Sequence, residues 1–254
     1  MKFFRKIRQN LLVQGRVTRY LLYAIGEIVL VVIGILFALQ INNWNEQKIV
    51  TEKERHALTE IQSDLEINTT SLNKMLYHEV HGVEHYLQAF DIIIFNLEET
   101  QVYHDSLAIH FGELFSYPDL VLKYSGYESL TSIGMDLISD HQLRSEIGSF
   151  YTYRIPLAQM TFNYLRDDFY HYMLDYRNKS FITTHIENEA PDSENSGPDI
   201  SVPIDYEALV SNQAFVESLK TYRSIFRSFK RESILMLAEC EALHSEVENE
   251  LKEQ

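Results

Sequence analysis

The sequence predicts an all-α protein in which one N-terminal transmembrane helix continues into an extracytoplasmic helical bundle with long antiparallel helices. Three observations support this prediction: an apolar run at residues 20–41, a basic flank before it, and apolar residues spaced by three, four and seven over most of the later chain. Spacings of three and four place side chains on one face of an α-helix, whereas strands alternate every second residue. The sequence contains no alternating pattern of useful length.

The apolar run is long enough to cross a membrane. It contains one charged residue, Glu27, and its 22 residues at about 1.5 Å each form a helix of roughly 33 Å, against a bilayer core of about 30 Å. A cleaved signal peptide is the alternative, because it also places an apolar run after a basic segment. This run is longer than a typical signal-peptide core, and no small-x-small cleavage pattern follows it. We therefore expect an uncleaved anchor over residues 20–41.

Residues 1–19 set the expected orientation. They carry six basic residues and no acidic one: Lys2, Arg5, Lys6, Arg8, Arg16 and Arg19. Basic residues beside a span stay in the cytoplasm, so this segment is expected to be a cytoplasmic amphipathic tail that contacts the lipid headgroups. Residues 42–254 would then be periplasmic. The chain is expected to be a single-pass protein of the inner (cytoplasmic) membrane, with the lipid bilayer as one partner.

Residues 42–254 are expected to fold as one acidic helical domain. They hold 16 Lys plus Arg against 36 Asp plus Glu, a net charge of −20. Proteins bind the phosphates of nucleic acids through clustered cations, so nucleic acid is excluded as a partner. Cys240 is the only cysteine. No disulfide can form within the chain, and packing must stabilise the domain.

Two apolar stripes predict two long helices that pack together. The first continues from the span to about residue 96, and its members share one helical face: Leu58, Ile61, Leu65, Leu72, Leu76, Val80, Val83, Leu87, Phe90 and Ile94. The second has a heptad-like spacing interrupted only by Ser233: Phe215, Leu219, Tyr222, Phe226, Phe229, Met236, Cys240, Leu243 and Val247. Helices with such stripes bury them together in a bundle or coiled coil.

Capping motifs predict shorter helices between the two long ones. Ser125 with Glu128 fits the capping box, in which a hydroxyl and a carboxylate satisfy the first free N–H groups of a helix. Ser139 with Gln142 fits the same pattern. We therefore expect one helix to begin directly after each serine.

Prolines and one polar segment divide this middle region further. Pro118 breaks the chain before the first short helix, and Pro156 either kinks the second or begins a third through the aromatic-rich residues 162–176. Residues 187–203 are rich in Pro, Asp, Ser, Asn and Glu and lack apolar periodicity. They are expected to form an exposed loop.

Two segments resemble a known family. The first reads MKFFRKIRQNLL and then YLLYAIGEIVLVVIGILFALQINNWNE, and it is similar to the opening of an uncharacterised Bacteroidota membrane-protein family with a domain of unknown function. The second reads GYESLTSIGMDLISDHQLRSEIGSFY, with five residues in corresponding places: Tyr127, Leu130, Gly134, Leu143 and Tyr151. The resemblance implies a single-span inner-membrane protein with an external helical domain. It supplies no activity, cofactor or catalytic residue.

Glu27 is the sharpest single candidate for function. A carboxylate in a span costs about 2.5–3.5 kcal/mol near the bilayer centre, so we expect an interaction that offsets this cost. Glu27 shares a helical face with Gly34 and Ala38, a small-xxx-small pair that permits close approach of another helix. This face predicts a membrane-helix contact, with another protein or with a second copy of the chain. The alternative is a proton-carrying carboxyl in the small subunit of an ion-coupled membrane complex.

Three closely spaced histidines raise the hypothesis of a metal site: His78, His81 and His85. About 10.5 Å of helix rise separates the first from the last, so one helix offers at most two ligands, such as His81 and His85. Further ligands from a second helix would make the chain a metal-dependent extracytoplasmic enzyme. The favoured interpretation is a solvated face or a second packing contact, because these residues lie opposite the first apolar stripe.

The sequence therefore predicts a membrane-anchored module for protein interaction, assembly or sensing, with no catalytic residue and no cofactor. The H-E pair at His78 lacks the second zinc ligand of H-E-x-x-H, because Gly82 occupies that position. Cys240 and His244 could form a thiol–base pair, but Cys240 lies in the second apolar stripe. We expect it to be a buried, inert thiol.

Overall fold

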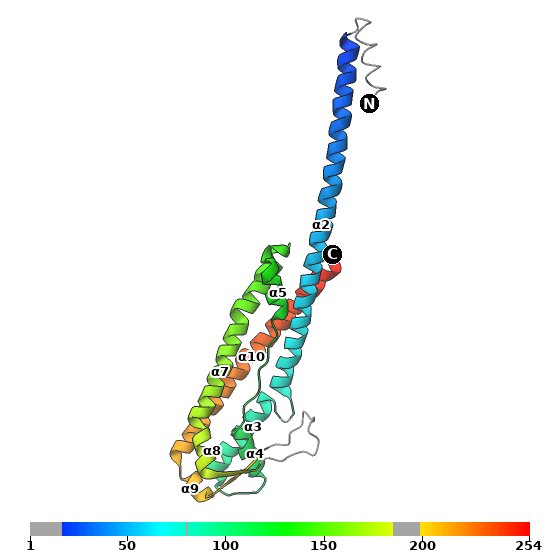
Figure 1. The fold of residues 1–254 in the computed structure, drawn as a ribbon. Coiled ribbons are helices and arrows are strands. Elements are labelled where there is room, and N and C mark those ends of the chain that lie inside the picture. The colour runs from blue at the N-terminus through cyan, green and yellow to red at the C-terminus, as the bar shows by residue number, and fades with distance from the viewer. Residues whose placement is uncertain (1–16, 80, 185–198) are drawn as a thin grey trace. The chain divides into compact units, whose positions relative to one another are not determined.

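The computed structural model describes residues 17–79, 81–184 and 199–254. The chain divides into two compact units, Met1–Glu54 and Arg55–Gln254. Most described residues are helical, which confirms the predicted fold class (Figure 1). The longer helices are α2 (Val17–Tyr77), α3 (Val83–Phe95), α7 (Ile155–Tyr172) and α10 (Gln213–Glu253). The shorter helical elements are η1 (Asn96–Thr100), α4 (Leu107–Leu114), α5 (Ser125–Ile133), η2 (Met135–Leu137), α6 (His141–Ser149), η3 (Phe150–Arg154), α8 (Leu174–Ser180) and α9 (Tyr206–Val210).

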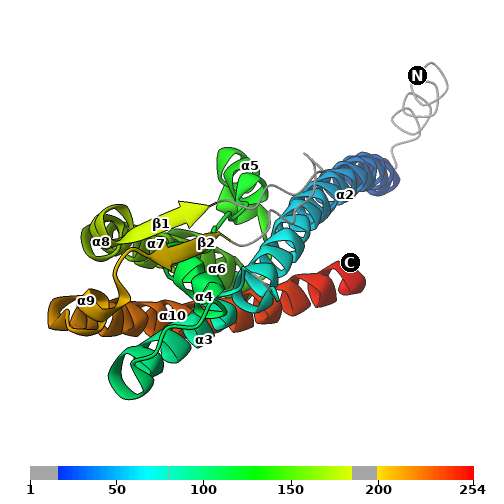
Figure 2. The ribbon, with the colours of Figure 1, turned by 90° about the horizontal axis from the view of Figure 1, so that it is seen from below.

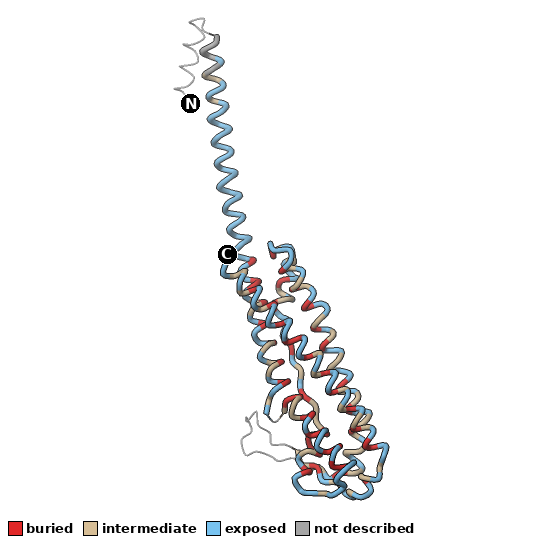
Figure 3. The backbone as a smooth tube through the Cα atoms, turned by 180° about the vertical axis from the view of Figure 1, so that it is seen from behind, coloured by how far each residue is buried: buried red, intermediate tan, exposed pale blue. Residues whose placement is uncertain are grey.

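The first unit holds the N-terminal part of α2, which is apolar and exposed. Every residue from Ile28 to Val50 is exposed (Figure 3). Among the described residues, one helix is long and apolar enough to cross a membrane, judged by length and composition, and its most apolar window has no residue buried in the chain. The predicted span of residues 20–41 lies in this helix, which continues beyond the span as expected. The predicted amphipathic tail falls mostly on residues 1–16, outside the described part.

The second unit has its own hydrophobic core. α10 packs against both α3 and α7 (Figures 1 and 2), and residues 55–77 of α2 add their apolar side chains. Both predicted stripes are buried wherever the structure describes them. The rings of Phe90, Tyr222 and Phe226 contact one another, with centroid distances of 5.7, 5.4 and 5.1 Å.

Side-chain contacts establish that α10 runs antiparallel to α2 and α3. Thr69 Oγ1 donates to Cys240 Sγ at 3.4 Å, and Leu65 O accepts from the same thiol at 3.4 Å. Further along, Asp91 accepts from Arg223 at 2.7 Å. Residue numbers therefore fall along α10 as they rise along α2 and α3, as the antiparallel prediction requires.

The first long helix is interrupted, unlike the prediction that it continues to residue 96. α2 ends at Tyr77 and α3 begins at Val83. The chain turns tightly at Gly82, whose N–H donates to the carbonyl of His78 at 2.9 Å. A Cβ at Gly82 would lie 2.5 Å from that carbonyl oxygen and 2.6 Å from the amide nitrogen of His78. Only glycine allows this close approach of two backbone segments.

α5 begins where predicted, but an acidic side chain of α2 holds its first turn. Gly126 N–H donates to Asp64 Oδ2 at 2.5 Å, and Ser125 Oγ donates to Asp64 Oδ1 at 3.2 Å. One turn further along α2, Asn68 accepts from the Lys123 N–H at 2.6 Å and donates to the Lys123 carbonyl at 2.7 Å. Asp64 and Asn68 thus bind residues 123–126 to α2, and the predicted cap by Ser125 was wrong.

α6 also begins where predicted, with a different cap from the predicted Ser139. The carboxylate of Asp140 accepts from the N–H of Leu143 at 2.8 Å. α6 continues through η3 into α7, and Pro156 lies in the first turn of α7. This proline therefore begins a third helix, one of the two expected outcomes. The π-helical element η3 ends two residues before this proline, and such a wider turn accommodates a residue that lacks a backbone N–H.

A small antiparallel sheet interrupts the helical pattern. β1 (Phe181–Thr184) pairs with β2 (Ile200–Pro203), with Phe181 opposite Pro203 and Thr184 opposite Ile200 (Figure 2). The predicted exposed loop at 187–203 is therefore wrong for the four residues of β2, where Ser201 is fully buried. Residues 185–198 lie outside the described part. β2 packs on α4.

Candidate functional site

A polar groove of about 510 Å³ lies in the second unit. Its walls are the C-terminal turns of α2, the start of α3 and the segment after α4, with these residues: Ser71, Lys74, Met75, His78, His81, Tyr86, Ser116, Tyr117, Pro118, Asp119 and Val121. Four of these residues share a helical face, because spacings of three and four place side chains on one side of a helix: Ser71, Lys74, Met75 and His78. The volume is within the range of small-molecule sites.

The two histidines of the groove are ordered relative to each other. Their rings stack with a centroid distance of 5.7 Å and an interplanar angle of 10°. The backbone N–H of His81 donates to Nδ1 of His78 at 3.2 Å. A neutral His78 ring that accepts at Nδ1 carries its proton at Nε2, so its outer nitrogen is a hydrogen-bond donor. We call Lys74, His78 and His81 the basic wall of the groove.

Glu113 of α4 is a buried carboxylate that sequence reasoning missed. It is 6% exposed, and each of its oxygens meets a different histidine. Oε1 contacts Nε2 of His85 from α3, and Oε2 lies 3.1 Å from Nδ1 of His110. These contacts from two helices compensate the burial of the charge. The pairing across helices leaves no signal in the sequence spacing.

The two predicted metal ligands have different surroundings. His85 contacts Glu113, whereas His81 stacks on His78 in the groove. In the part of the chain that the structure describes, no group of three or more His, Cys, Asp or Glu side chains is arranged to hold a metal ion. Metal binding at His81 and His85 stays a sequence prediction that no described geometry supports.

Buried tyrosine hydroxyls lie near the groove. Burial, and then the charges of Glu113, Asp119 and Asp199, raise the pKa of Tyr86. Burial also raises the pKa of Tyr222, with contributions from neighbours that include Tyr86. The Tyr222 hydroxyl has no hydrogen-bond partner among the described residues. At neutral pH both hydroxyls keep their protons and can donate.

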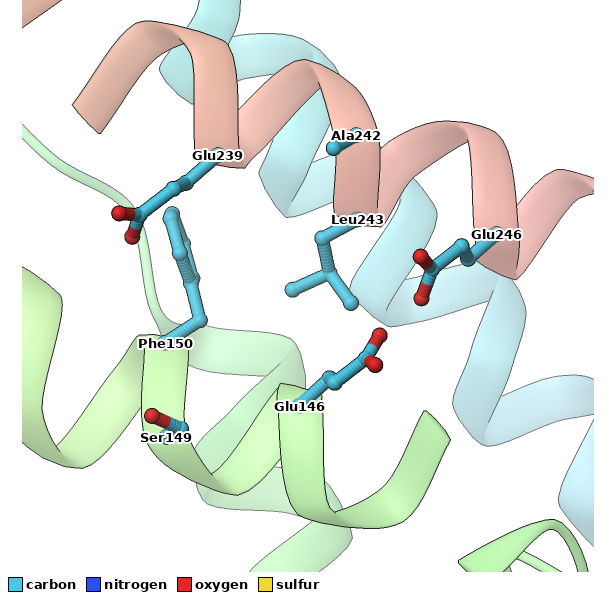
Figure 4. Close-up of a pocket in the computed structure, with 7 residues that line it drawn as sticks. All are labelled: Glu146, Ser149, Phe150, Glu239, Ala242, Leu243 and Glu246. Carbon is cyan, nitrogen blue, oxygen red and sulfur yellow. The ribbon is translucent and has the colours of Figure 1, made fainter. Parts of the chain in front are cut away.

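A second, acidic pocket of about 220 Å³ lies between α10 and the α6–η3 segment (Figure 4). It is lined by Glu146, Ser149, Phe150, Glu239, Ala242, Leu243 and Glu246. The carboxylates of Glu146 and Glu246 point toward each other from the two helices (Figure 4). The hydrogen bond from Glu146, partial burial, and the charges of Glu146 and Asp140 raise the pKa of Glu246 to about 7. The two carboxyl groups therefore share a proton below neutral pH.

Cys240 has the environment that the sequence predicts. It is fully buried, and burial raises the pKa of its thiol to about 11. The hydrogen bond from Thr69 lowers this pKa, but its effect is smaller than that of burial. A thiol that stays protonated at neutral pH is a poor nucleophile. The cysteine is part of the packing between α2 and α10.

The predicted membrane-helix face lies on the exposed part of α2. Gly34 and Ala38 are exposed, and a Cβ at Gly34 would meet no atom within 4 Å. Glu27 is partly buried on the same helix. Gly34 and Ala38 are thus accessible to a helix of another protein or of a second copy, and the use of this face remains a proposal.

One comparison with known proteins gives a match. Residues 27–107 match a family of unknown function, DUF6090. The matched residues begin in the apolar part of α2 and end at the first residue of α4. Searches of curated proteins and of solved structures found no match.

Proposed function

We propose that this chain is a single-pass inner-membrane protein whose helical domain, residues 55–254, lies in the periplasm and serves protein interaction, assembly or sensing. One observation carries the proposal: α2 is apolar over residues 20–41 and its most apolar window has no residue buried in the chain, whereas residues 55–254 enclose a core of their own. An exposed apolar helix of this length suits a bilayer and not water. The six basic residues before it support a cytoplasmic N-terminus.

The interaction role has support from two surfaces. On α2, Glu27, Gly34 and Ala38 share the face that we propose as the contact with a partner helix or with a second copy. In the second unit, the polar groove offers donors and acceptors at a volume suited to a small molecule.

A reporter fusion tests the orientation. A reporter enzyme that is active only outside the cytoplasm, fused after Gln254, is expected to be active, and a reporter that works only in the cytoplasm is expected to be silent there. Changing the basic residues before the span to glutamine should reduce this preference, because the charge bias is then lost. Activity of the cytoplasmic reporter alone would reverse the proposed topology.

A further inference from the structure

The small sheet of the second unit has a strand edge that faces away from the other strand. In the described part of the chain, β1 and β2 form a sheet of two strands (Figure 2). Ile204 N–H donates to the Ser180 carbonyl at 2.9 Å, so these residues form a hydrogen-bonded pair that continues the register of the sheet. Such pairs alternate with non-bonded pairs, which include Phe181 and Thr183. The N–H and C=O groups of Phe181 and Thr183 therefore point to the outer edge of β1.

The two edges of the sheet differ in their protection against other strands. Natural sheets protect a free edge with proline, with charged side chains or with a covering element. On β2, Pro203 is in a non-bonded pair and places no N–H on the outer edge, and β2 packs on α4. β1 reads Phe-Ile-Thr-Thr and contains no proline, glycine or charged residue. Among the described residues, β1 thus carries the unprotected edge.

The outer face of the sheet is apolar and free of charge. Ile182 and Val202 lie opposite each other and are 64% and 39% exposed, and Ile204 beside them is 62% exposed. The residues of both strands include no charged side chain, within a domain of net charge −20. Two copies of such a domain repel each other over most of their surfaces. At the edge of β1 they can approach without placing like charges of the strands against each other.

The sequence of β1 is complementary to itself in an antiparallel pairing. When a two-fold axis passes beside Ile182, Phe181 of one copy lies opposite Thr183 of the second copy. Residues opposite each other at these positions exchange two N–H···O=C bonds, so every outward N–H and C=O of Phe181 and Thr183 gains a partner. Ile182 then lies opposite Ile182 of the second copy on the exposed face, and such pairs of β-branched side chains stabilise sheets.

We propose that β1 is a docking edge for a second copy of this chain, and that the two copies join their sheets into one antiparallel sheet of four strands. The inference rests on the proposed interaction role, for which it names a surface and a partner. Copies held in one membrane have a raised effective concentration, so a contact of a few hydrogen bonds is sufficient. This contact is separate from the proposed contact between membrane helices.

Cysteine cross-linking of the full chain in native membranes tests the pairing. Cys240 is the only natural cysteine and is fully buried, so an introduced surface cysteine is the reactive thiol. In the joined sheet the two Ile182 Cα atoms lie about 4.5 Å apart, and the two Val202 Cα atoms lie roughly 15 Å apart. A disulfide requires Cα atoms within about 7 Å. Under mild oxidation, Ile182→Cys is therefore expected to give a disulfide-linked dimer at a yield several-fold above that of Val202→Cys.

A second substitution tests the hydrogen bonds of the edge. Thr183→Pro removes an outward N–H and leaves the bonds between β1 and β2 in place, as Pro203 does on the other edge. Combined with Ile182→Cys, it is expected to reduce the dimer yield several-fold. Thr183→Val is the matched control, because it also loses the hydroxyl contact with Ser201 but keeps the N–H. Circular dichroism checks that each variant keeps its helical fold.

Three results would overturn the proposal: no dimer from Ile182→Cys, equal yields from Ile182→Cys and Val202→Cys, and equal yields with Thr183→Pro and Thr183→Val. If Thr183→Pro does not fold, the comparison of the two cysteine positions decides alone. None of these results would alter the reporter activity after Gln254. The failure of the docking edge is therefore distinguishable from the failure of the membrane-anchored module.

Discussion

At the scale of single residues, the buried polar side chains of α2 decide how the segment after α4 is held. Asn68 is fully buried, and its side chain makes two hydrogen bonds with the backbone of Lys123. These two bonds join α2 to the segment after α4. Asp64 binds the start of α5 in the same way. Both interrupt the apolar stripe of α2, so the sequence marks them as unusual. The partners are more than 50 residues away, and spacing alone does not identify them.

Asn68→Ala is therefore expected to destabilise the domain by about 1–3 kcal/mol, because it removes two hydrogen bonds that contribute about 0.5–1.5 kcal/mol each. Urea unfolding followed by circular dichroism measures the change. Asn73→Ala is the matched control, since the Asn73 amide donates to the Thr69 carbonyl within its own helix. Equal stability of the two variants would show that the Asn68 contacts contribute nothing.

The residues of the membrane-helix face give a second prediction at this scale. If the face is a contact, Glu27→Gln should retain most association, because an amide still hydrogen-bonds between helices, and Gly34→Leu should disrupt it by blocking close approach. Cross-linking in native membranes measures association. If Glu27 carries protons, Glu27→Gln should abolish function while association survives. Unchanged association of the Gly34→Leu protein would exclude this face as the contact.

At the scale of elements, the turn between α2 and α3 depends on the lack of a side chain at Gly82. Gly82→Ala is expected to destabilise the domain by about 1–3 kcal/mol, because its Cβ would meet backbone atoms of His78 that cannot move independently. Thermal unfolding measures the loss. Gly148→Ala is the control, since a Cβ there would lie 3.9 Å from the end of the Met135 side chain. A Gly82→Ala protein as stable as this control would contradict the packing at the turn.

The contact between α6 and α10 is expected to depend on pH. The pKa of Glu246 rises from 4.5 to about 7 on folding, so the folded state holds this proton more tightly. The resulting stabilisation is present below about pH 4.5 and is lost as the pH rises through 7, where both carboxylates ionise and repel. The contribution of this carboxyl pair to thermal stability should therefore decrease as the pH is raised from about 4.5 to 7.

Glu146→Gln should reduce this pH dependence, because an amide can donate to the ionised Glu246. Glu253→Gln, near the end of α10, removes the same charge and should leave the dependence unchanged. An unaltered pH profile in the Glu146→Gln protein would show that the two carboxylates do not share a proton.

The elements also show what the sequence reveals and what it conceals. α10 and the part of α2 that ends at Tyr77 follow from apolar periodicity, because that signal is local. α5 and α6 begin where the capping motifs predict, although Asp64 and Asp140 make the contacts in place of the predicted serines. The caps from Asp64 and the strand β2 were missed, because each depends on a partner distant in sequence. The groove was missed for the same reason: His78 and His81 were marked by their spacing, but nothing in the sequence places Asp119 near them.

At the scale of the whole molecule, the central claim is that an apolar anchor and a self-contained helical domain coexist in one chain. The division at Glu54 and the separate core of residues 55–254 support this claim. Among the described residues, none of the apolar segment 20–41 contributes to that core. The domain should therefore not need the anchor to fold.

The most direct measurement compares the full chain with residues 55–254, each produced in cells and separated into membrane and soluble fractions. The full chain is expected to stay in the membrane pellet after alkaline washing, because about 20 apolar residues span the bilayer. Residues 55–254 are expected to be soluble, strongly helical by circular dichroism and to unfold cooperatively. Release of the full chain by the alkaline wash would contradict the anchor, and an unfolded or β-rich spectrum of residues 55–254 would contradict the self-contained helical domain.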